Sequence, residues 1–384
     1  MNVYSLFRER SQHGADFLVA PDGNAIYSYD DLEITSGRLA ARLNSLGVSP
    51  GDRVIVQAQK SPMCVMLYFA CLRAGAIYLP LNTAYLDEEL RYFVSDAEPV
   101  LIVCDPEKAA FFSSIGDATV ATLDRDGWGT LVDDLASEST LNTIDVDGDH
   151  IAAILYTSGT TGRPKGAMIS HDNLASNGLA LHKAWQWCEG DVMLHALPIF
   201  HVHGLFVATN LAVLNASPII FLAAFDPDLV IDWLPNATVY MGVPTNYTRL
   251  LATGKLNKEV CANMRLFTSG SAPLLPQTFN TFRDTTGHEI VERYGMTETG
   301  MNTSNPLEGS RKPGTVGPPL PGVSVRIVDD DGEDVPATEP GNLLVKGRNV
   351  FKGYWRLPEK TAEEFTGDFF KTGDIATIDN DGYI

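Results

Sequence analysis

The 384 residues combine 45% hydrophobic with 20% charged side chains, a balance typical of a globular protein with a large core or several packed subdomains. With 28 Lys and Arg against 48 Asp and Glu, the formal net charge is −20, which argues against nucleic acids and anionic membrane surfaces as partners. The most apolar stretch, residues 204–225, contains Asn210, Asn215 and Pro218, so we expect a core helix, a turn and a strand there, not a membrane span.

Strand and helix signals alternate through the first 305 residues, which predicts the α/β class with largely parallel sheets. Asp30 or Asp31 is expected to cap one helix, and Asp87 another. Pro62 is expected in the first turn of a helix that runs to Gly75. The expected buried strands are residues 53–58, 100–104, 151–156, 218–222, 238–241 and 265–268.

Gly and Pro become dense after residue 305, in R-K-P-G-T-V-G-P-P-L-P-G-V at 311–323. Short strands are expected at 323–328 and 342–347, with turn signals between them. This change in composition predicts a small β subdomain at about 306–384. The five cysteines are odd in number and lack metal-ligand spacing, which predicts buried, reduced thiols and a cytoplasmic location; they are Cys64, Cys71, Cys104, Cys188 and Cys261.

The most informative segment is Y-T-S-G-T-T-G-R-P-K-G at 156–166, which follows a predicted buried strand. Its glycines let the backbone approach a phosphate, its hydroxyls donate hydrogen bonds, and Lys165 supplies a positive charge. The segment is not a Walker loop, because Lys165 follows Pro164 and precedes Gly166. The ordinary alternative is a solvated turn, but the eleven contiguous residues favour a phosphate site.

This segment resembles the signature of the adenylate-forming superfamily, which includes acyl-CoA synthetases, peptide-synthetase adenylation domains and firefly luciferase. Further motifs of that family follow in the same order: A-L-P-I-F-H-V-H-G-L at 196–205, S-G-S-A-P-L at 269–274, Y-G-M-T-E-T at 294–299, G-T-V-G-P-P-L-P-G at 314–322 and K-T-G-D at 371–374. The resemblance implies the family's large N-terminal domain, with two parallel-sheet α/β subdomains over about 1–305 and a small β-barrel-like subdomain over about 306–384.

The resemblance also implies an ATP-dependent reaction in which a carboxylate attacks the α-phosphorus, followed by transfer of the acyl group to coenzyme A. It assigns the β- and γ-phosphates to Thr157, Ser158, Gly159, Thr160, Thr161, Gly162 and Lys165. It assigns the adenosine to Gly270, Ser271, Ala272, Tyr294, Gly295 and Met296, with Asp374 on the ribose. Glu298 would bind Mg²⁺, Thr297 the α-phosphate, and His201 would face the reacting groups, which makes Lys165, His201, Thr297 and Glu298 the expected catalytic residues.

Two further histidines, His195 and His203, are expected to be packed and hydrogen-bonded. His201 and His203 could form a metal pair, but no third ligand has convincing spacing.

Arg293, directly before Y-G-M-T-E-T, suits the second carboxylate of a dicarboxylic acid. The sequence of residues 291–306 is similar to that of malonyl-CoA synthetases. In those enzymes the positions that match Val202 and Met301 lie near the α-carbon of the acid. Members of that subgroup often carry Thr and Asn where Val202 and Gly300 stand, which leaves methylmalonate open. The alternative for Arg293 is a surface salt bridge with Glu292 or Glu289.

Other functions are open at this point. They are a short- or medium-chain fatty acyl-CoA synthetase, a catalytically incomplete nucleotide-binding fragment and an aminoacyl-adenylating module; a phosphotransferase is disfavoured because a kinase catalytic loop is absent. Relatives continue beyond a G-Y such as Gly382–Tyr383 into a lid domain that carries a Lys and surfaces for coenzyme A. We therefore expect this chain to be weak or inactive alone.

Overall fold

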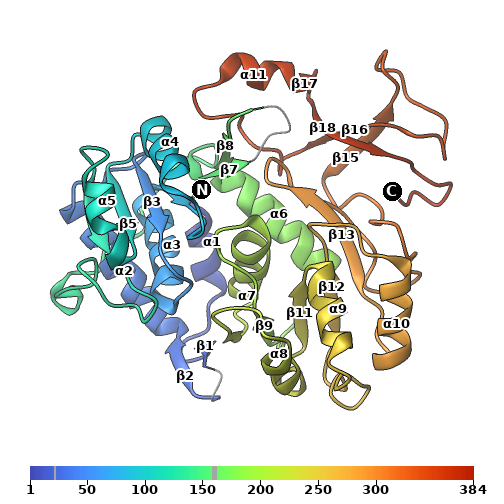
Figure 1. The fold of residues 1–384 in the computed structure, drawn as a ribbon, viewed down its shortest axis with the longest axis horizontal. Helices are drawn as coiled ribbons and strands as arrows, with labels where there is room; N and C mark the ends of the chain where they lie inside the picture. Colours follow the sequence, from blue (N-terminus) through green and yellow to red (C-terminus); the bar gives the residue numbers. More distant parts are fainter. Residues whose placement is uncertain (21–22, 158–161) are drawn as a thin grey trace.

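Two mainly parallel sheets and one small antiparallel sheet organise the computed structural model, which describes residues 1–20, 23–157 and 162–384 (Figure 1). The predicted α/β class with a small curled β subdomain is confirmed.

The six-stranded sheet has the order β6-β5-β3-β4-β7-β8, and all its neighbours are parallel except β7 and β8. Its strands are β3 (Arg53–Gln57), β4 (Ile77–Pro80), β5 (Leu101–Cys104), β6 (Thr119–Thr122), β7 (Ile151–Thr157) and β8 (Lys165–Ser170). Buried β-branched and aliphatic side chains fill β3 and β5, as expected for strands covered on both faces.

The eight-stranded sheet has the order β14-β13-β12-β11-β9-β10-β1-β2, with antiparallel pairs at both edges. Its strands are β1 (Asp16–Val19), β2 (Ala25–Ser28), β9 (Met193–His195), β10 (Ile219–Phe221), β11 (Val239–Gly242), β12 (Leu266–Ser269), β13 (Val291–Met296) and β14 (Gly300–Ser304). All the strands predicted from the sequence are present within one or two residues.

The helices of the two α/β layers are α1 (Val3–Arg10), α2 (Tyr29–Ser45), α3 (Pro62–Ala74), α4 (Asp87–Ala97), α5 (Ala109–Ser113), α6 (His171–Ala184), α7 (Asn210–Leu214), α8 (Pro227–Trp233), α9 (Pro244–Ala252) and α10 (Pro276–Thr286). Helix α3 begins at Pro62 and is capped by Gly75 in the left-handed region, as predicted. A π-helix, His203–Thr209, precedes α7, so the apolar stretch 204–225 is indeed helix, turn and strand. Helices α1, α3, α6 and α7 contact one another between the two large sheets (Figure 1).

Two predicted helix caps are wrong. Ser28, not Asp30 or Asp31, caps α2, because its hydroxyl accepts from the Asp31 N–H while the Asp31 carboxylate accepts from the Ser28 N–H. Leu86 occupies the cap position of α4, so Asp87 is its first helical residue.

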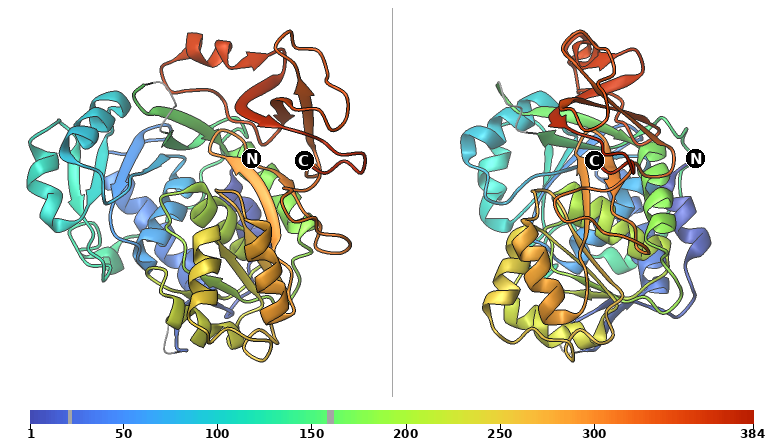
Figure 2. Two further views of the ribbon diagram at one scale, coloured as in Figure 1. Left: turned by 45° about the vertical axis from the view of Figure 1, so that its right-hand side comes forward. Right: turned by 90° about the vertical axis from the view of Figure 1, so that its right-hand side faces the viewer.

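The small sheet has the order β15-β16-β18-β17 and is antiparallel throughout. Its elements are β15 (Val323–Val328), β16 (Gly341–Gly347), α11 (Pro358–Glu363), β17 (Phe365–Thr366) and β18 (Phe369–Ala376). It lies over the ends of β7, β8 and β13, coloured red in Figure 2. Phe351, Tyr354 and Phe370 belong to the same buried cluster as the core of the α/β layers. The boundary near residue 305 remains a prediction.

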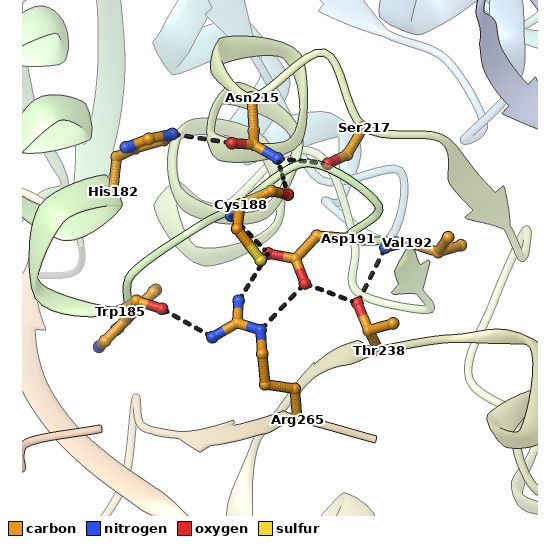
Figure 3. Close-up of polar contacts among 9 residues, drawn as sticks. All are labelled: His182, Trp185, Cys188, Asp191, Val192, Asn215, Ser217, Thr238 and Arg265. Carbon is orange, nitrogen blue, oxygen red and sulfur yellow. Dashed lines mark hydrogen bonds and ion pairs between the residues drawn. The ribbon is translucent and has the colours of Figure 1, made fainter. Parts of the chain in front are cut away.

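A polar network ties three parallel strands together at their N-terminal ends (Figure 3). The Asp191 carboxylate, just before β9, accepts two hydrogen bonds from Arg265, just before β12, at 2.6 and 3.0 Å. It also accepts from the Thr238 hydroxyl, just before β11, at 2.9 Å. The polar groups at the N-terminal ends of these strands therefore bond to one another. We expect ligands at the opposite, C-terminal ends of the strands.

Four of the five cysteines are buried, as predicted, but Cys188 is exposed, because it lies in the turn before β9. Among the described residues, no helix is long and apolar enough to cross a membrane.

Candidate functional site

The predicted site residues gather where parallel strands of both large sheets end. Thr157 ends β7, His195 ends β9, and Gly270 directly follows β12. The carboxyl ends of parallel strands are where open α/β sheets bind ligands, because the loops diverge there and leave a crevice. Ser158, Gly159, Thr160 and Thr161 lie outside the described residues. Gly162 is exposed.

Glu298 is the centre of the first group of contacts. Its buried side chain accepts hydrogen bonds at Oε1 from the Tyr354 hydroxyl at 3.0 Å and the Thr157 hydroxyl at 3.3 Å. Lys165 Nζ lies 4.2 Å from the centre of the Tyr354 ring and 3.4 Å from Glu364 Oε1. The structure therefore brings the predicted phosphate lysine and the predicted magnesium ligand to the two sides of one tyrosine.

Tyr294 and Asp374 form a second group. The Tyr294 hydroxyl donates to Asp374 Oδ2 at 2.5 Å, although 80 residues separate the two in sequence. Asp374 is exposed on β18, and no described residue hydrogen-bonds to its Oδ1. One carboxylate oxygen therefore remains for a diol.

The turn after β12 offers exposed backbone for a ligand. Ser271 is held at φ = +70°, a strained value for a residue with a side chain, and Ala272 beside it is exposed. Gly295 and Met296 are half-buried at the end of β13. Gly295 must lack a side chain, because a Cβ would lie 2.1 Å from the Gly300 carbonyl oxygen across the hairpin.

Arg293 is buried, 1% exposed, and none of its three guanidinium nitrogens has a hydrogen-bond partner among the described residues. The alternative of a surface salt bridge with Glu292 or Glu289 is therefore wrong. The guanidinium lies against Gly270, where a Cβ would come within 2.5 Å of Cζ. Burial lowers the pKa of Arg293 to about 10, so the group is still a cation at neutral pH.

His203 lies beside this arginine. Burial, followed by the charge of Arg293, holds the pKa of His203 well below its usual value, so the ring is neutral. Its Nδ1 lies 3.5 Å from the Ser271 hydroxyl, whereas its buried Nε2 has no partner among the described residues. The predicted packing of His203 is correct, but its hydrogen bonding is incomplete. An unpaired buried donor is costly, and an anion is the kind of group that could satisfy these nitrogens.

The remaining predicted residues lie close by. Val202, Thr297 and Gly300 line a small cavity of about 20 Å³ that also touches Asn177. Asn177 holds the backbone of Met301 at both its N–H and its carbonyl, at 3.0 and 2.8 Å. His201 is exposed, with its ring 4.5 Å from that of Phe200, and no hydrogen bond joins it to the other described site residues.

Three contributors were missed by the sequence reasoning. Tyr354 and Glu364 contact Lys165, and Asn177 holds Met301. Each lies far from its partner along the chain, so no local sequence pattern pointed to it. Within the described residues no group of three or more His, Cys, Asp or Glu could hold a metal by itself. A cation at Glu298 would therefore need ligand oxygens as well.

Comparisons with known proteins agree with this geometry. The family model described as AMP-binding enzyme matches residues 7–355. The chain is 36% identical to a probable CoA ligase, CCL8, of Humulus lupulus, matching 89% of this chain and 62% of the relative. It is 32% identical to the malonate–CoA ligase of Arabidopsis thaliana, matching all of this chain and 69% of the relative.

Among solved structures, the ATP-bound MatB from Rhodopseudomonas palustris superposes with a TM-score of 0.97 at 51% identity, covering 100% of this chain and 77% of that one. The chain thus spans about two thirds of the length of the curated relatives it matches. On the family match and these identities, the chain belongs to the AMP-binding enzyme family.

Proposed function

We propose that this chain holds the sites for Mg·ATP and malonate in an acyl-CoA synthetase that converts malonate to malonyl-AMP and then, with coenzyme A, to malonyl-CoA. Membership of the AMP-binding family and the similarity to a malonate–CoA ligase support the reaction class. The structural observation that carries the choice of acid is the pair of unpartnered buried donors at Arg293 and His203.

A monocarboxylate offers nothing to this pair once its only carboxylate approaches the α-phosphorus. A dicarboxylic acid keeps a second carboxylate, which a guanidinium grips with two parallel hydrogen bonds. Because His203 is neutral, its Nε2 can donate while Nδ1 accepts from the Ser271 hydroxyl. Malonate, with one carbon between its carboxylates, suits an anion site close to the reacting groups.

The first half-reaction forms a bond between a malonate oxygen and the α-phosphorus and breaks the bond to the β-phosphate, so that pyrophosphate leaves with the electron pair. Two anions must approach each other, so the residues act mainly by neutralising charge. Lys165 would exchange its contact with Glu364 for phosphate oxygens. Thr297, half-buried beside Val202, would donate its hydroxyl to the α-phosphate.

Glu298 fits a magnesium ligand. One of its oxygens is held by Tyr354 and Thr157, and no described residue hydrogen-bonds to the other. Mg²⁺ prefers one or two carboxylates together with phosphate oxygens, and when bound it would neutralise the polyphosphate.

We take the cavity lined by Val202 as the space next to the α-carbon of the acid, because Val202 matches a position near that carbon in malonyl-CoA synthetases. Its volume of about 20 Å³ is close to that of one water molecule. A methyl substituent on the α-carbon is therefore about the largest that we expect the site to take, which keeps methylmalonate as a second substrate.

The test is calorimetric titration of this chain with malonate, methylmalonate, acetate and butyrate, each in the presence of Mg²⁺ and a non-hydrolysable ATP analogue. We expect binding of the two dicarboxylates and little binding of the others. Arg293→Leu should abolish malonate binding, whereas Arg283→Leu, which removes an exposed arginine of α10, should not. Equal binding of butyrate and malonate by the parent, unchanged in Arg293→Leu, would mean that Arg293 does not select the acid.

A further inference from the structure

Lys60 links the two large sheets next to the site. It lies three residues after β3, and its Nζ reaches His195 at the end of β9, 3.0 Å from Nδ1 and 3.1 Å from the carbonyl oxygen. The ammonium also lies 4.6 Å from the centre of the Phe221 ring. No carboxylate of a described residue forms an ion pair with it, and burial holds its pKa well below the usual value. Lys60 is half-buried, and removing an ammonium from water without a counter-ion carries a desolvation cost.

The contacts of His195 fix the position of its proton. Nε2 lies 2.8 Å from the Gly204 carbonyl oxygen, which can only accept, so Nε2 must carry the hydrogen. A neutral ring with its hydrogen on Nε2 has a lone pair on Nδ1, so Nδ1 accepts from Lys60 Nζ. The contact with Gly204 therefore selects the tautomer, and the contact with Lys60 is compatible with it. A leucine or methionine at position 60 would leave the buried Nδ1 without a donor.

The two ends of this relay bracket the loop that carries the acid-binding residues. His195 begins the segment and Gly204 closes it, with His201, Val202 and His203 between them. Gly204 packs so tightly that a Cβ would come 2.0 Å from the Pro198 carbonyl oxygen, which brings the far end of the loop back onto its start. Thr209 Oγ1, 2.9 Å from the same Gly204 oxygen, adds a second hydrogen bond there.

One face of the loop borders empty space. A cavity of about 260 Å³ lies between the ends of the two large sheets, and its wall includes Lys60, Tyr78, Thr83, Pro198 and Phe200. The loop therefore has an open volume on this face, and a hydrogen-bonded link across its base would keep it in place. Phe200, which contacts His201, is in this wall.

We infer that Lys60 is a positioning residue, which acts through His195 and the Gly204 carbonyl to hold the loop 196–203 in the conformation that binds the acid. The inference rests on the proposed function for the identity of the acid. It does not need Lys60 to touch malonate or ATP. The groups assigned to the nucleotide, Lys165, Glu298 and Asp374, lie on other segments, so the relay should affect the acid and spare the nucleotide.

Four variants separate the parts of the relay. Lys60→Met keeps most of the volume and removes the donor, whereas Lys60→Arg keeps donors and has the adjoining cavity for its extra atoms. His195→Asn places an amide near Nδ1 and removes the contact with Gly204. His195→Gln places one near Nε2 and removes the side-chain contact with Lys60, while the contact of Lys60 with the backbone carbonyl remains. Lys255→Met is the matched control, because Lys255 is exposed and pairs only with Asp228 on the surface.

Calorimetry gives the first readout, with malonate titrated into each variant in the presence of Mg²⁺ and a non-hydrolysable ATP analogue. Lys60→Met should bind malonate at least about tenfold more weakly, the loss expected for a hydrogen bond to a charged group. The affinity for the analogue should change less than about twofold, and Lys60→Arg should recover most of the malonate affinity. Unchanged malonate affinity in Lys60→Met, in a parent that binds malonate, would overturn the inference.

Two further measurements do not depend on the acid. In histidine-selective ¹⁵N spectra, assigned with His195→Gln, the parent His195 should carry its proton on Nε2, and the Nδ1 resonance should shift in Lys60→Met because Nδ1 loses its donor. Amide hydrogen exchange over 196–205 should be faster in Lys60→Met than in Lys255→Met. If the parent binds no malonate, the proposed function fails, while these two readouts still decide the relay. A parent His195 protonated on Nδ1, or unchanged exchange, would rule the relay out.

Discussion

At the scale of single residues, Asp374 gives the sharpest test of nucleotide binding. Asp374→Ala should weaken Mg·ATP binding by roughly a factor of ten to a hundred, because a carboxylate that accepts from a vicinal diol makes charge-assisted hydrogen bonds. Calorimetric titration with Mg·ATP measures this. Asp368→Ala is the matched control, since Asp368 is an exposed carboxylate in the turn between β17 and β18 that pairs with Lys346. Equal losses in both variants would show a general charge effect and not a ribose contact.

Glu292, on β13 beside Arg293, predicts a pH dependence of stability. Burial raises the pKa of this carboxyl from 4.5 to about 7, although the hydrogen bond from the Leu274 N–H opposes the rise. The folded state therefore binds more protons than the unfolded state between these two values. The contribution of Glu292 to stability is complete below about pH 4.5 and is lost as the pH rises to about 7.

Urea denaturation of the parent and of Glu292→Gln across this pH range measures that contribution. Glutamine keeps an oxygen for the Leu274 N–H and cannot ionise, so the variant should lose less stability between pH 4.5 and 7 than the parent. Glu308→Gln, which changes an exposed carboxyl, should follow the parent. Parallel curves for the parent and Glu292→Gln would place the pKa of Glu292 near its ordinary value.

At the scale of elements, the turn between β12 and α10 decides where the Arg293 side chain lies. A Cβ at Gly270 would come within 2.5 Å of the buried Arg293 guanidinium, so Gly270→Ala must displace the Arg293 side chain. We expect malonate affinity to fall at least tenfold and the free energy of unfolding to fall by about 1–3 kcal/mol, as for other overpacked sites. Calorimetry and urea denaturation measure the two effects. Gly178→Ala in α6, where a Cβ meets only Leu214 at 3.7 Å, should leave both nearly unchanged.

The sequence predicted a helix or strand correctly where neighbouring residues alone determine its bounds. Pro62 and Gly75 bound α3 because one is preorganised for a first turn and the other adopts the left-handed cap. The cap of α2 was predicted wrongly because Ser28, Asp30 and Asp31 are all suitable capping residues. The reciprocal hydrogen bonds between Ser28 and Asp31 identify Ser28 as the cap. The π-helix at His203–Thr209 was not predicted, because the apolar residues of this stretch fit an ordinary core helix equally well.

At the scale of the whole molecule, the motifs predicted which residues form the site but not how deeply they are buried or what they contact. The burial of Arg293 depends on where β12 and β13 place Gly270, and nothing within a few residues of Arg293 encodes that. The contacts of Tyr354 with Glu298, between β13 and β14, and with Lys165, at the start of β8, join the small β subdomain to both large sheets. Such long-range contacts decide the electrostatics of the site, which is why Tyr354, Asn177 and Lys60 were missed.

The attachment of the small β subdomain to the two α/β layers can be tested by comparing its apolar and ionic contacts. Phe351 is buried in the shared core, with its ring 4.9 Å from Tyr354 and 5.2 Å from Phe370. Three exposed cations of the β subdomain form ion pairs across the same junction: Arg348 with Asp172, Lys352 with Asp149 and Arg356 with Glu98.

Phe351→Ala should lower the free energy of unfolding by about 3–5 kcal/mol through lost burial and a residual cavity. Removing all three cations together, as Arg348→Ala, Lys352→Ala and Arg356→Ala, should cost only about 1–2 kcal/mol, because exposed ion pairs are screened by water and salt. Urea denaturation followed by tryptophan fluorescence and by circular dichroism, at low and high salt, measures both. High salt should reduce the difference in free energy of unfolding between the parent and the triple variant. The difference between the parent and Phe351→Ala should not change with salt. Since Phe351 belongs to one continuous core, we expect the two probes to coincide in the parent; a separate early transition in Phe351→Ala would mean that the β subdomain unfolds by itself.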